Sequence, residues 1–143
     1  MENRKVGIKM LFSEKTLFAS EYNPLAVAYI GDTVYDLFIR TKIMEKGNRQ
    51  VTNMHKEAVK FVNASAQAKC VQMIEPYLNE RELHFIKWGK NAKSASVPKN
   101  ANVKDYHAAT GFEVLIGSLY IENKTQRLNE ILNIAYEKML NIL

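Results

Sequence analysis

The stretch NPLAVAYIGDTVYDLFI, residues 23–39, is the strongest indication of the fold. Asn23 is a good N-cap and Pro24 suits a first helical turn, so a helix is expected to begin here and to run to about Glu45. Its apolar residues cover more than one stripe, which is typical of a helix that is central to the core or shared with a partner. The acidic Asp32 lies in the middle of this apolar run.

Helical periodicity continues along the chain. Apolar residues recur at helical spacing over residues 51–78, and Pro76 is expected to end that run. A short helix is predicted over residues 80–90, with Gly89 as its stop. A segment of about fifteen residues without periodicity follows, and unstructured segments of that length are usually functional or disordered.

Two further helices are predicted after this segment. Asp105 is expected to cap a helix that runs through HAATGFEVLIGSLYIEN, residues 107–123, and Thr125 is expected to cap a final amphipathic helix. The sequence contains no convincing alternating strand or repeat. The expected fold is therefore all-α, with residues 1–143 forming a single domain of which about the first 20 residues are peripheral.

Neither a leader nor a membrane segment is expected. In MENRKVGIKMLFSEK, residues 1–15, Lys9 interrupts an apolar run that is already too short for a signal peptide. The most apolar later segment, LAVAYIGDTVYDLFI, holds two aspartates and is too short and too charged to span a bilayer. A cytoplasmic location is the resulting expectation.

The positive charge of the chain is concentrated in one segment. The net charge is +5, and KWGKNAKSASVPKNANVK, residues 87–104, contains five lysines and no acid, so the remainder of the chain is formally neutral. A localised basic excess favours a polyanionic partner. The alternative is that this segment is a mobile, solvated linker without a binding role. Interleaved asparagines and serines favour nucleic acid, because amide and hydroxyl groups bond phosphate and 2′-OH oxygens.

Two carboxylates lie inside apolar helical segments instead of on solvated faces: Asp32 in AYIGDTVYDLF and Glu113 in GFEVLIGSLY. A structural role is one interpretation, in which each acid is satisfied by a basic side chain or a backbone donor, because buried charges must be paired. A functional site is the other, since perturbed acids also gather there. Gly31 and Gly117, which lie near the two acids in the sequence, predict a close approach of the two helices.

Other routes to chemistry have weak support. His55, His84 and His107 are far apart and lack metal-ligand spacing, so each is interpreted as a structural or surface residue. The segment GKNAKSAS, residues 89–96, has lysines but not the spacing of a phosphate-binding glycine loop. Nucleotide hydrolysis is therefore not expected.

Three segments together resemble one family. NPLAVAYIGDTVYDL (residues 23–37) is similar to the signature helix of the ribonuclease III endonuclease domain, and GFEVLIGSLYIEN (residues 111–123) to that family's second acidic helix. KWGKNAKSASVPKN (residues 87–100) resembles the basic segment before the second helix. They occur in the family's order, and the resemblance covers nearly the whole chain. The subgroup it resembles most is mini-ribonuclease III, which lacks a double-stranded-RNA-binding domain, and the length of 143 residues leaves no room for one.

The resemblance implies a homodimeric, Mg²⁺-dependent endonuclease that cleaves double-stranded RNA and matures the large-subunit ribosomal RNA precursor. Asp32 matches the signature aspartate and Glu113 the glutamate of the second helix, so both are predicted catalytic and metal-binding residues. The full family pattern has two further acids at the positions of Ala28 and Thr110. The mini-ribonuclease III subgroup lacks these acids as this chain does, so the number of metal ions per site stays open. Asp36, one turn beyond Asp32, is either an assisting acid or a surface or packing residue.

The chemistry of the implied ligands agrees with these residues. Mg²⁺ prefers oxygen ligands and often binds through one or two carboxylates plus substrate phosphate. A-form RNA exposes a wide, shallow minor groove, so recognition should depend on shape and backbone. The residues predicted to contact RNA are Lys87, Lys90, Asn91, Lys93, Lys99 and Asn100. The predicted dimer contact is the excess apolar surface of the first helix, formed by Val27, Ile30, Val34 and Phe38.

Two other classes of function stay open from the sequence. The missing acids at Ala28 and Thr110 also fit a degenerate domain that binds structured RNA without cutting it. A helical regulator that binds DNA or protein is less favoured, because the sequence has no clear helix-turn-helix spacing.

Overall fold

A computed structural model describes residues 12–92 and 97–143 of the chain. Within these ranges the chain forms α-helices, short 3-10 helices and connecting turns, and no strand, which confirms the expected all-α fold. None of the described helices has the length and apolar character needed to cross a membrane. The elements are η2 (Ala19–Glu21), α1 (Pro24–Met44), α2 (Val51–Val62), α3 (Ala64–Ile74), η3 (Glu75–Tyr77), α4 (Glu80–Lys90), α5 (Val103–Ile121) and α6 (Thr125–Leu140).

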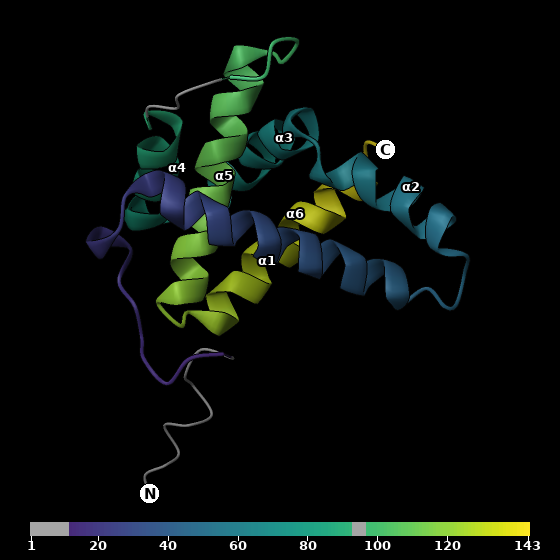
Figure 1. Cartoon of the computed structure of the whole chain (residues 1–143), viewed down its shortest axis with the longest axis horizontal. Helices are drawn as coiled ribbons and strands as arrows, with labels where there is room; N and C mark the ends of the chain where they lie inside the picture. Colours follow the sequence, from purple (N-terminus) through teal and green to yellow (C-terminus); the bar gives the residue numbers. More distant parts are fainter. Residues whose placement is uncertain (1–11, 93–96) are drawn as a thin grey trace, which may run out of the picture.

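Helix α5 is the centre of the fold. From Ala109 to Leu119 every residue except Glu113 is buried. Helices α1, α3, α4 and α6 all pack against α5, and Figure 1 shows α1 crossing in front of it. A helix enclosed by four others needs apolar residues on nearly all sides, which explains why its sequence shows no single apolar stripe.

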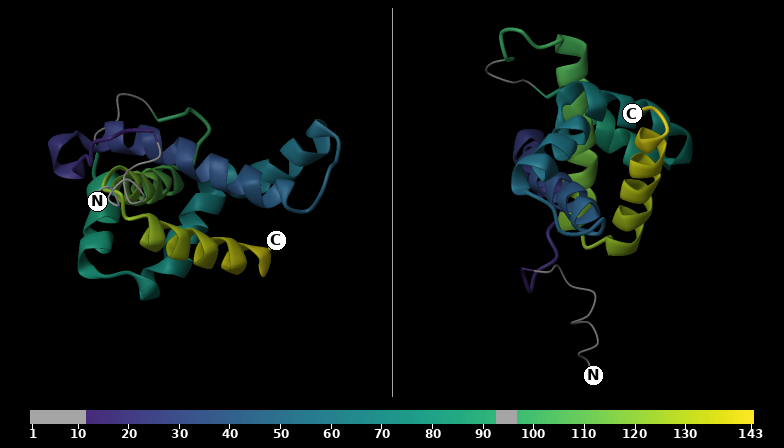
Figure 2. Two further views of the ribbon diagram at one scale, coloured as in Figure 1. Left: turned by 90° about the horizontal axis from the view of Figure 1, so that it is seen from below. Right: turned by 90° about the vertical axis from the view of Figure 1, so that its right-hand side faces the viewer.

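Helix α1 begins as its sequence predicts. The side chain of Asn23 accepts a hydrogen bond from the backbone N–H of Ala26 at 2.9 Å, and Pro24 is the first helical residue. The helix ends at Met44, and Gly47 follows in a left-handed conformation with a φ of 114°. Beyond this turn α2 folds back along α1, so the two helices form a hairpin that extends past the α4–α5 part of the molecule (Figure 2).

Three predictions about the later helix ends were wrong. Gly89 does not stop α4, because this glycine lies inside the helix where α4 touches α5, and a Cβ there would be 2.7 Å from the Cα of Gly111. Asp105 does not cap α5; its N–H donates to the side chain of Asn102, the true cap, at 3.1 Å. Thr125 is the first residue of α6 and makes no capping bond.

Two glutamates that the sequence did not single out are buried in ion pairs. Glu82 accepts hydrogen bonds from the guanidinium of Arg127 at 2.8 and 2.9 Å, which joins α4 to α6. Glu122, at the end of α5, accepts from Arg81 at 2.7 and 3.1 Å and from the N–H of Ala19 at 2.9 Å. Ala19 is therefore fixed in the core. These carboxylates join the helices of the scaffold.

Candidate active site

The candidate site lies where α1 crosses α5. A Cβ added to Gly31 would overlap the backbone carbonyl of Glu113, and one added to Gly117 would overlap the carbonyl of Val27. Only glycine permits two helix backbones to come this close. The predicted close approach at Gly31 and Gly117 is confirmed, and it places Asp32, the residue after Gly31, next to Glu113.

Asp32 and Glu113 form a pair of carboxyl groups. Asp32 is exposed at the surface, whereas Glu113 is half-buried among the apolar residues of α5. Burial, together with the charge of Asp32 and a hydrogen bond to its side chain, raises the pKa of Glu113 to about 8. Two acids that meet in a partly desolvated position repel one another when both are ionised, so the pair favours a shared proton or a bound cation.

A purely structural role, in which a basic side chain neutralises a buried acid, describes Glu82 and Glu122 better than it describes Asp32 and Glu113. Burial would raise the pKa values of Glu82 and Glu122, but arginine and backbone N–H donors lower them below their ordinary values. In the part of the chain that the structure describes, Glu113 has Asp32 as its electrostatic partner and no basic side chain. The pair offers hard oxygen donors without a competing cation, which is the ligand chemistry that Mg²⁺ prefers.

Two buried residues without a carboxylate stand where the full family pattern has its other acids. Ala28 and Thr110 are both buried, and the hydroxyl of Thr110 donates to the backbone carbonyl of Tyr106 at 3.0 Å. No group of three or more metal-binding side chains of the His, Cys, Asp or Glu type occurs among the described residues. Asp32 and Glu113 therefore fit one cation whose other ligands come from water or substrate.

The described lysines of the basic segment lie at the end of α4 and just before α5, the helix that carries Glu113. Lys87 and Lys90 occupy the last turn of α4, and Lys99 lies in the turn before α5. All three are exposed, and none is in an ion pair with another residue of the described ranges. The aliphatic stem of Lys90 passes beside Gly111, two residues before Glu113. The structure thus brings lysines that have no ion-pair partner among the described residues close to the helix that carries one of the acids.

The remaining predicted RNA-binding residues are less completely placed. Asn91 and Asn100 are exposed in the turns before and after residues 93–96. Lys93 lies outside the described residues.

The predicted dimer residues do not share one exposed surface. Val27 is 1% exposed and packs inside its own chain, so its side chain has no accessible surface for a partner. Ile30, Val34 and Phe38 are half-buried against the same core. The most exposed large apolar residue of α1 is Tyr29, at 81%. Amphipathic spacing could not separate these positions because α1 is apolar on several sides.

Asp36 was considered from the sequence, but Arg40 and His55, which line the same hollow as Asp32, were missed. A hollow of about 260 Å³ between α1 and α2 is lined by Asp32 together with Asp36, Arg40 and His55. The i, i+4, i+8 spacing of the first three on one helix was the signal that could have identified this lining. The contribution of His55, from a different helix, has no comparable signal in the sequence.

The similarity of this chain to known proteins places it in the class of ribonuclease III-type endoribonucleases. Residues 25–124 match the ribonuclease III domain family, and the chain belongs to this family. It is 47% identical to the Mini-ribonuclease 3 of Clostridium tetani, over 92% of this chain and 87% of that protein. It is 38% identical to the Mini-ribonuclease 3 of Enterococcus faecalis, over 83% and 92% of the two chains.

A solved structure gives the same result for the fold. The crystal structure of a protein from Fusobacterium nucleatum superposes on this chain with a TM-score of 0.73 and 29% sequence identity. The match covers 82% of this chain and 93% of that one. The resemblance to the ribonuclease III family read from three segments of sequence is therefore confirmed.

Proposed function

We propose that this endoribonuclease cleaves double-stranded RNA in a Mg²⁺-dependent reaction, with Asp32 and Glu113 as the metal-binding and catalytic residues. The observation that supports the proposal most strongly is their meeting at the α1–α5 crossing without a basic partner in the described chain. Ribonuclease III enzymes as a family act on double-stranded RNA and depend on divalent metal ions. The proposal brings both properties to this chain.

The residues of the chain have separable roles in this mechanism. Asp32 and Glu113 would hold the cation, which, when bound, supplies charge stabilisation at the phosphodiester and a lowered pKa for the attacking water. The backbone contact at Gly31 fixes the relative position of the two carboxylates. Because Glu113 resists ionisation in the metal-free protein, metal binding is coupled to loss of its proton.

The lysines at the α4–α5 connection would hold the RNA backbone. Lys87, Lys90 and Lys99 are exposed and free of ion pairs in the described chain, so their charges are available to phosphates. Asn91 and Asn100 would bond phosphate or 2′-OH oxygens. Lys93 belongs to the same proposal on its sequence position alone. Such contacts read shape and backbone, not sequence.

A homodimer completes the proposal, because two copies related by a two-fold axis present one site to each strand of a duplex. An apolar hollow of about 370 Å³ supports a contact on the N-terminal half of α1. It is lined by Tyr22, Ile30 and Tyr120 among others, and the exposed Tyr29 lies on the same half of the helix. Ile30 remains a proposed contact residue, with Val34 and Phe38 further along the helix.

The proposed natural substrate is the large-subunit ribosomal RNA precursor, in the cytoplasm. This part of the proposal rests on the resemblance to the mini-ribonuclease III subgroup. Incubation of the purified protein with precursor ribosomal RNA, followed by mapping of the new ends, tests it: discrete ends within a helical region are expected, and uncut precursor would contradict it.

Cleavage of a defined duplex tests the activity itself. The protein should cut a double-stranded RNA in the presence of Mg²⁺, leave the same RNA intact in a chelator, and leave single-stranded RNA and a DNA duplex of the same sequence uncut. Binding of duplex RNA without any metal-dependent product would instead favour the degenerate binding domain.

A further inference from the structure

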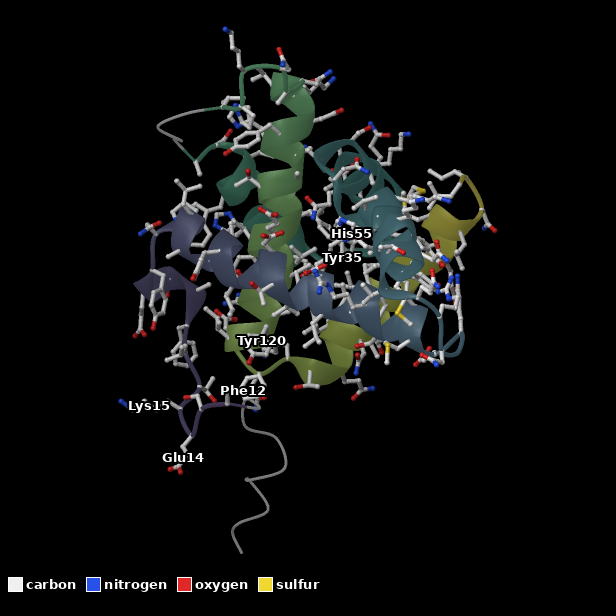
Figure 3. The ribbon with its side chains drawn as sticks, turned by 45° about the vertical axis from the view of Figure 1, so that its right-hand side comes forward. Phe12, Glu14, Lys15, Tyr35, His55 and Tyr120 are labelled. Carbon is white, nitrogen blue, oxygen red and sulfur yellow. The ribbon has the colours of Figure 1, made fainter. Side chains whose placement is uncertain are left out.

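A polar hollow adjoins the proposed metal site. It lies between α1 and α2, has a volume of about 260 Å³, and contains Asp32 in its wall. Figure 3 shows His55 of α2 beside the part of α1 that carries Tyr35. The other lining residues are Thr33, Asp36, Arg40, Ala58, Val59 and Val62. Any substrate that reaches Asp32 therefore has this hollow next to its reacting group.

The hollow extends along α1 from the acid toward an arginine. Asp32, Asp36 and Arg40 lie one helical turn apart on one face, each step advancing about 6 Å along the axis. Helical side chains point back toward the N-terminus. The side chain of Arg40 follows this rule, since its Nε donates to Asp36 at 3.3 Å. Its guanidinium thus lies about one turn from Asp32.

The donors of the hollow have unused capacity. Arg40 engages Asp36 through Nε, which leaves the Nη amino groups of the guanidinium for a ligand. No hydrogen bond or ion pair to another described residue involves the exposed imidazole of His55 or the hydroxyl of Thr33. A guanidinium, an imidazole and a hydroxyl that converge on one hollow match the oxygens of a phosphodiester.

Surface stabilisation is the ordinary explanation for the Asp36–Arg40 pair. An exposed i, i+4 ion pair contributes little to stability, and the Arg40 side chain is 66% exposed. The pair differs from a general surface pair because both residues line the hollow that also contains the proposed metal ligand Asp32 and the imidazole of His55. At its far end the hollow meets an apolar one of about 380 Å³, which Arg40 and His55 also line. The polar lining ends at these two residues.

We propose that Arg40 and His55 bind the phosphate of a nucleotide that neighbours the scissile one, and so position the strand for cleavage at Asp32. The inference rests on the proposed function and adds a second point of contact on the cut strand, distinct from the lysines of the α4–α5 connection. Asp36 is a positioning residue in this arrangement, because it orients the guanidinium of Arg40 without touching the RNA.

Kinetics of two variants test the contact. Arg40→Gln should raise KM for a duplex RNA about tenfold and leave kcat within a few-fold, since it removes a charge-assisted hydrogen bond to the phosphate. His55→Gln should raise KM several-fold. Arg40→Gln should also reduce the slope of log affinity against log salt by about one. Lys56→Gln removes a neighbouring exposed charge outside the hollow and is the matched control.

Modified RNA identifies the phosphate. In a duplex carrying one neutral methylphosphonate at successive positions, one position beside the cut should slow the wild-type enzyme about tenfold and cause no further loss in Arg40→Gln. If the wild type cuts the duplex and both variants match Lys56→Gln at every position, the inference is wrong while the proposed function stands. If the wild type cuts no duplex RNA, the proposed function itself fails. Thermal unfolding of each variant separates either result from misfolding.

Discussion

Two arrangements of buried acids in this chain differ in their partners. Where α4 meets α6 and where α5 ends, Glu82 and Glu122 each accept two hydrogen bonds from an arginine, and their pKa values are lowered. Where α1 crosses α5, Glu113 meets another carboxyl group, and its pKa is raised to about 8. Burial opposes ionisation in every case, so the neighbouring charge determines the direction of the shift.

The type of partner distinguishes acids that hold the fold together from acids that are available to bind a ligand. An arginine neutralises a buried acid permanently and joins two elements of the fold. A second acid leaves a negative charge that a proton or a metal ion can relieve, and a cation bound there stays accessible because Asp32 is exposed. The same residue type therefore stabilises the molecule in one region and is available for chemistry in the other.

The largest expected effect separates catalysis from stability. Glu113→Gln should reduce cleavage of duplex RNA on the order of a thousandfold, since charge stabilisation at a reacting group is typically of this size. The metal-free variant should be at least as stable as the wild type at pH 8, because the repulsion with Asp32 is gone. Urea unfolding and a cleavage assay measure both quantities. A variant that is inactive because it is unfolded would contradict the comparison.

Removing an arginine from the scaffold should have the opposite pattern. Arg127→Met leaves Glu82 buried without its guanidinium and should cost about 3 kcal/mol of unfolding free energy, with cleavage by the folded fraction retained. Arg49→Met is the matched control, because Arg49 pairs with Glu57 at the surface and its loss should cost less than about 1 kcal/mol. Equal losses in the two variants would show that burial of the Glu82 pair has no special effect.

The raised pKa of Glu113 predicts an unusual pH dependence. The ordinary value is 4.5, so between about pH 5 and 8 the folded state keeps a proton that the unfolded chain has lost, and stability falls as pH rises through this range. The loss in metal-free protein between pH 5 and pH 8 should be roughly 3 kcal/mol, relative to Glu113→Gln measured in parallel. Mg²⁺ should restore stability more at pH 8 than at pH 5. If the stability of the wild type changed with pH in the same way as that of Glu113→Gln, the proposed coupling between the two acids would be wrong.

The smallest expected effect concerns RNA binding by lysines that lie outside both groups of acids. Lys87→Ala with Lys90→Ala should weaken duplex RNA binding about tenfold at moderate salt and reduce the salt slope by about two, because two fewer counterions are released. Lys56→Ala with Lys69→Ala removes the same charge from α2 and α3 and serves as the control. An unchanged slope in the first variant would make the basic segment a linker.

The fold was largely predictable from local signals. The start of α1 at Asn23 and Pro24, the range of α4 and the glycine contact between α1 and α5 all follow from residues with strong conformational preferences. The caps at Asp105 and Thr125 were mispredicted, because several residues near each helix start are chemically suitable and tertiary packing selects among them. Gly89 was mistaken for a helix stop since a contact with another helix leaves no local signal.

The meeting of the two candidate acids was predictable because each is a polar residue in apolar surroundings. Asp32 and Glu113 interrupt apolar helices, and the sequence therefore marked both. Glu82 was not marked, because a glutamate three residues after Asn79 has the local role of a capping box. The inward position of Val27 and the approach of His55 to α1 depend on how helices cross, which periodicity along one helix does not determine.

The most direct test of the account is single-turnover cleavage of a duplex RNA by Asp32→Asn in Mg²⁺, with the dissociation constant for the same RNA measured alongside. The substitution preserves shape and removes the charge of one acid of the pair. We expect cleavage to fall to background while RNA affinity and the unfolding transition stay close to those of the wild type. Wild-type cleavage by this variant would contradict the claim that the two carboxylates at the α1–α5 crossing form the active site.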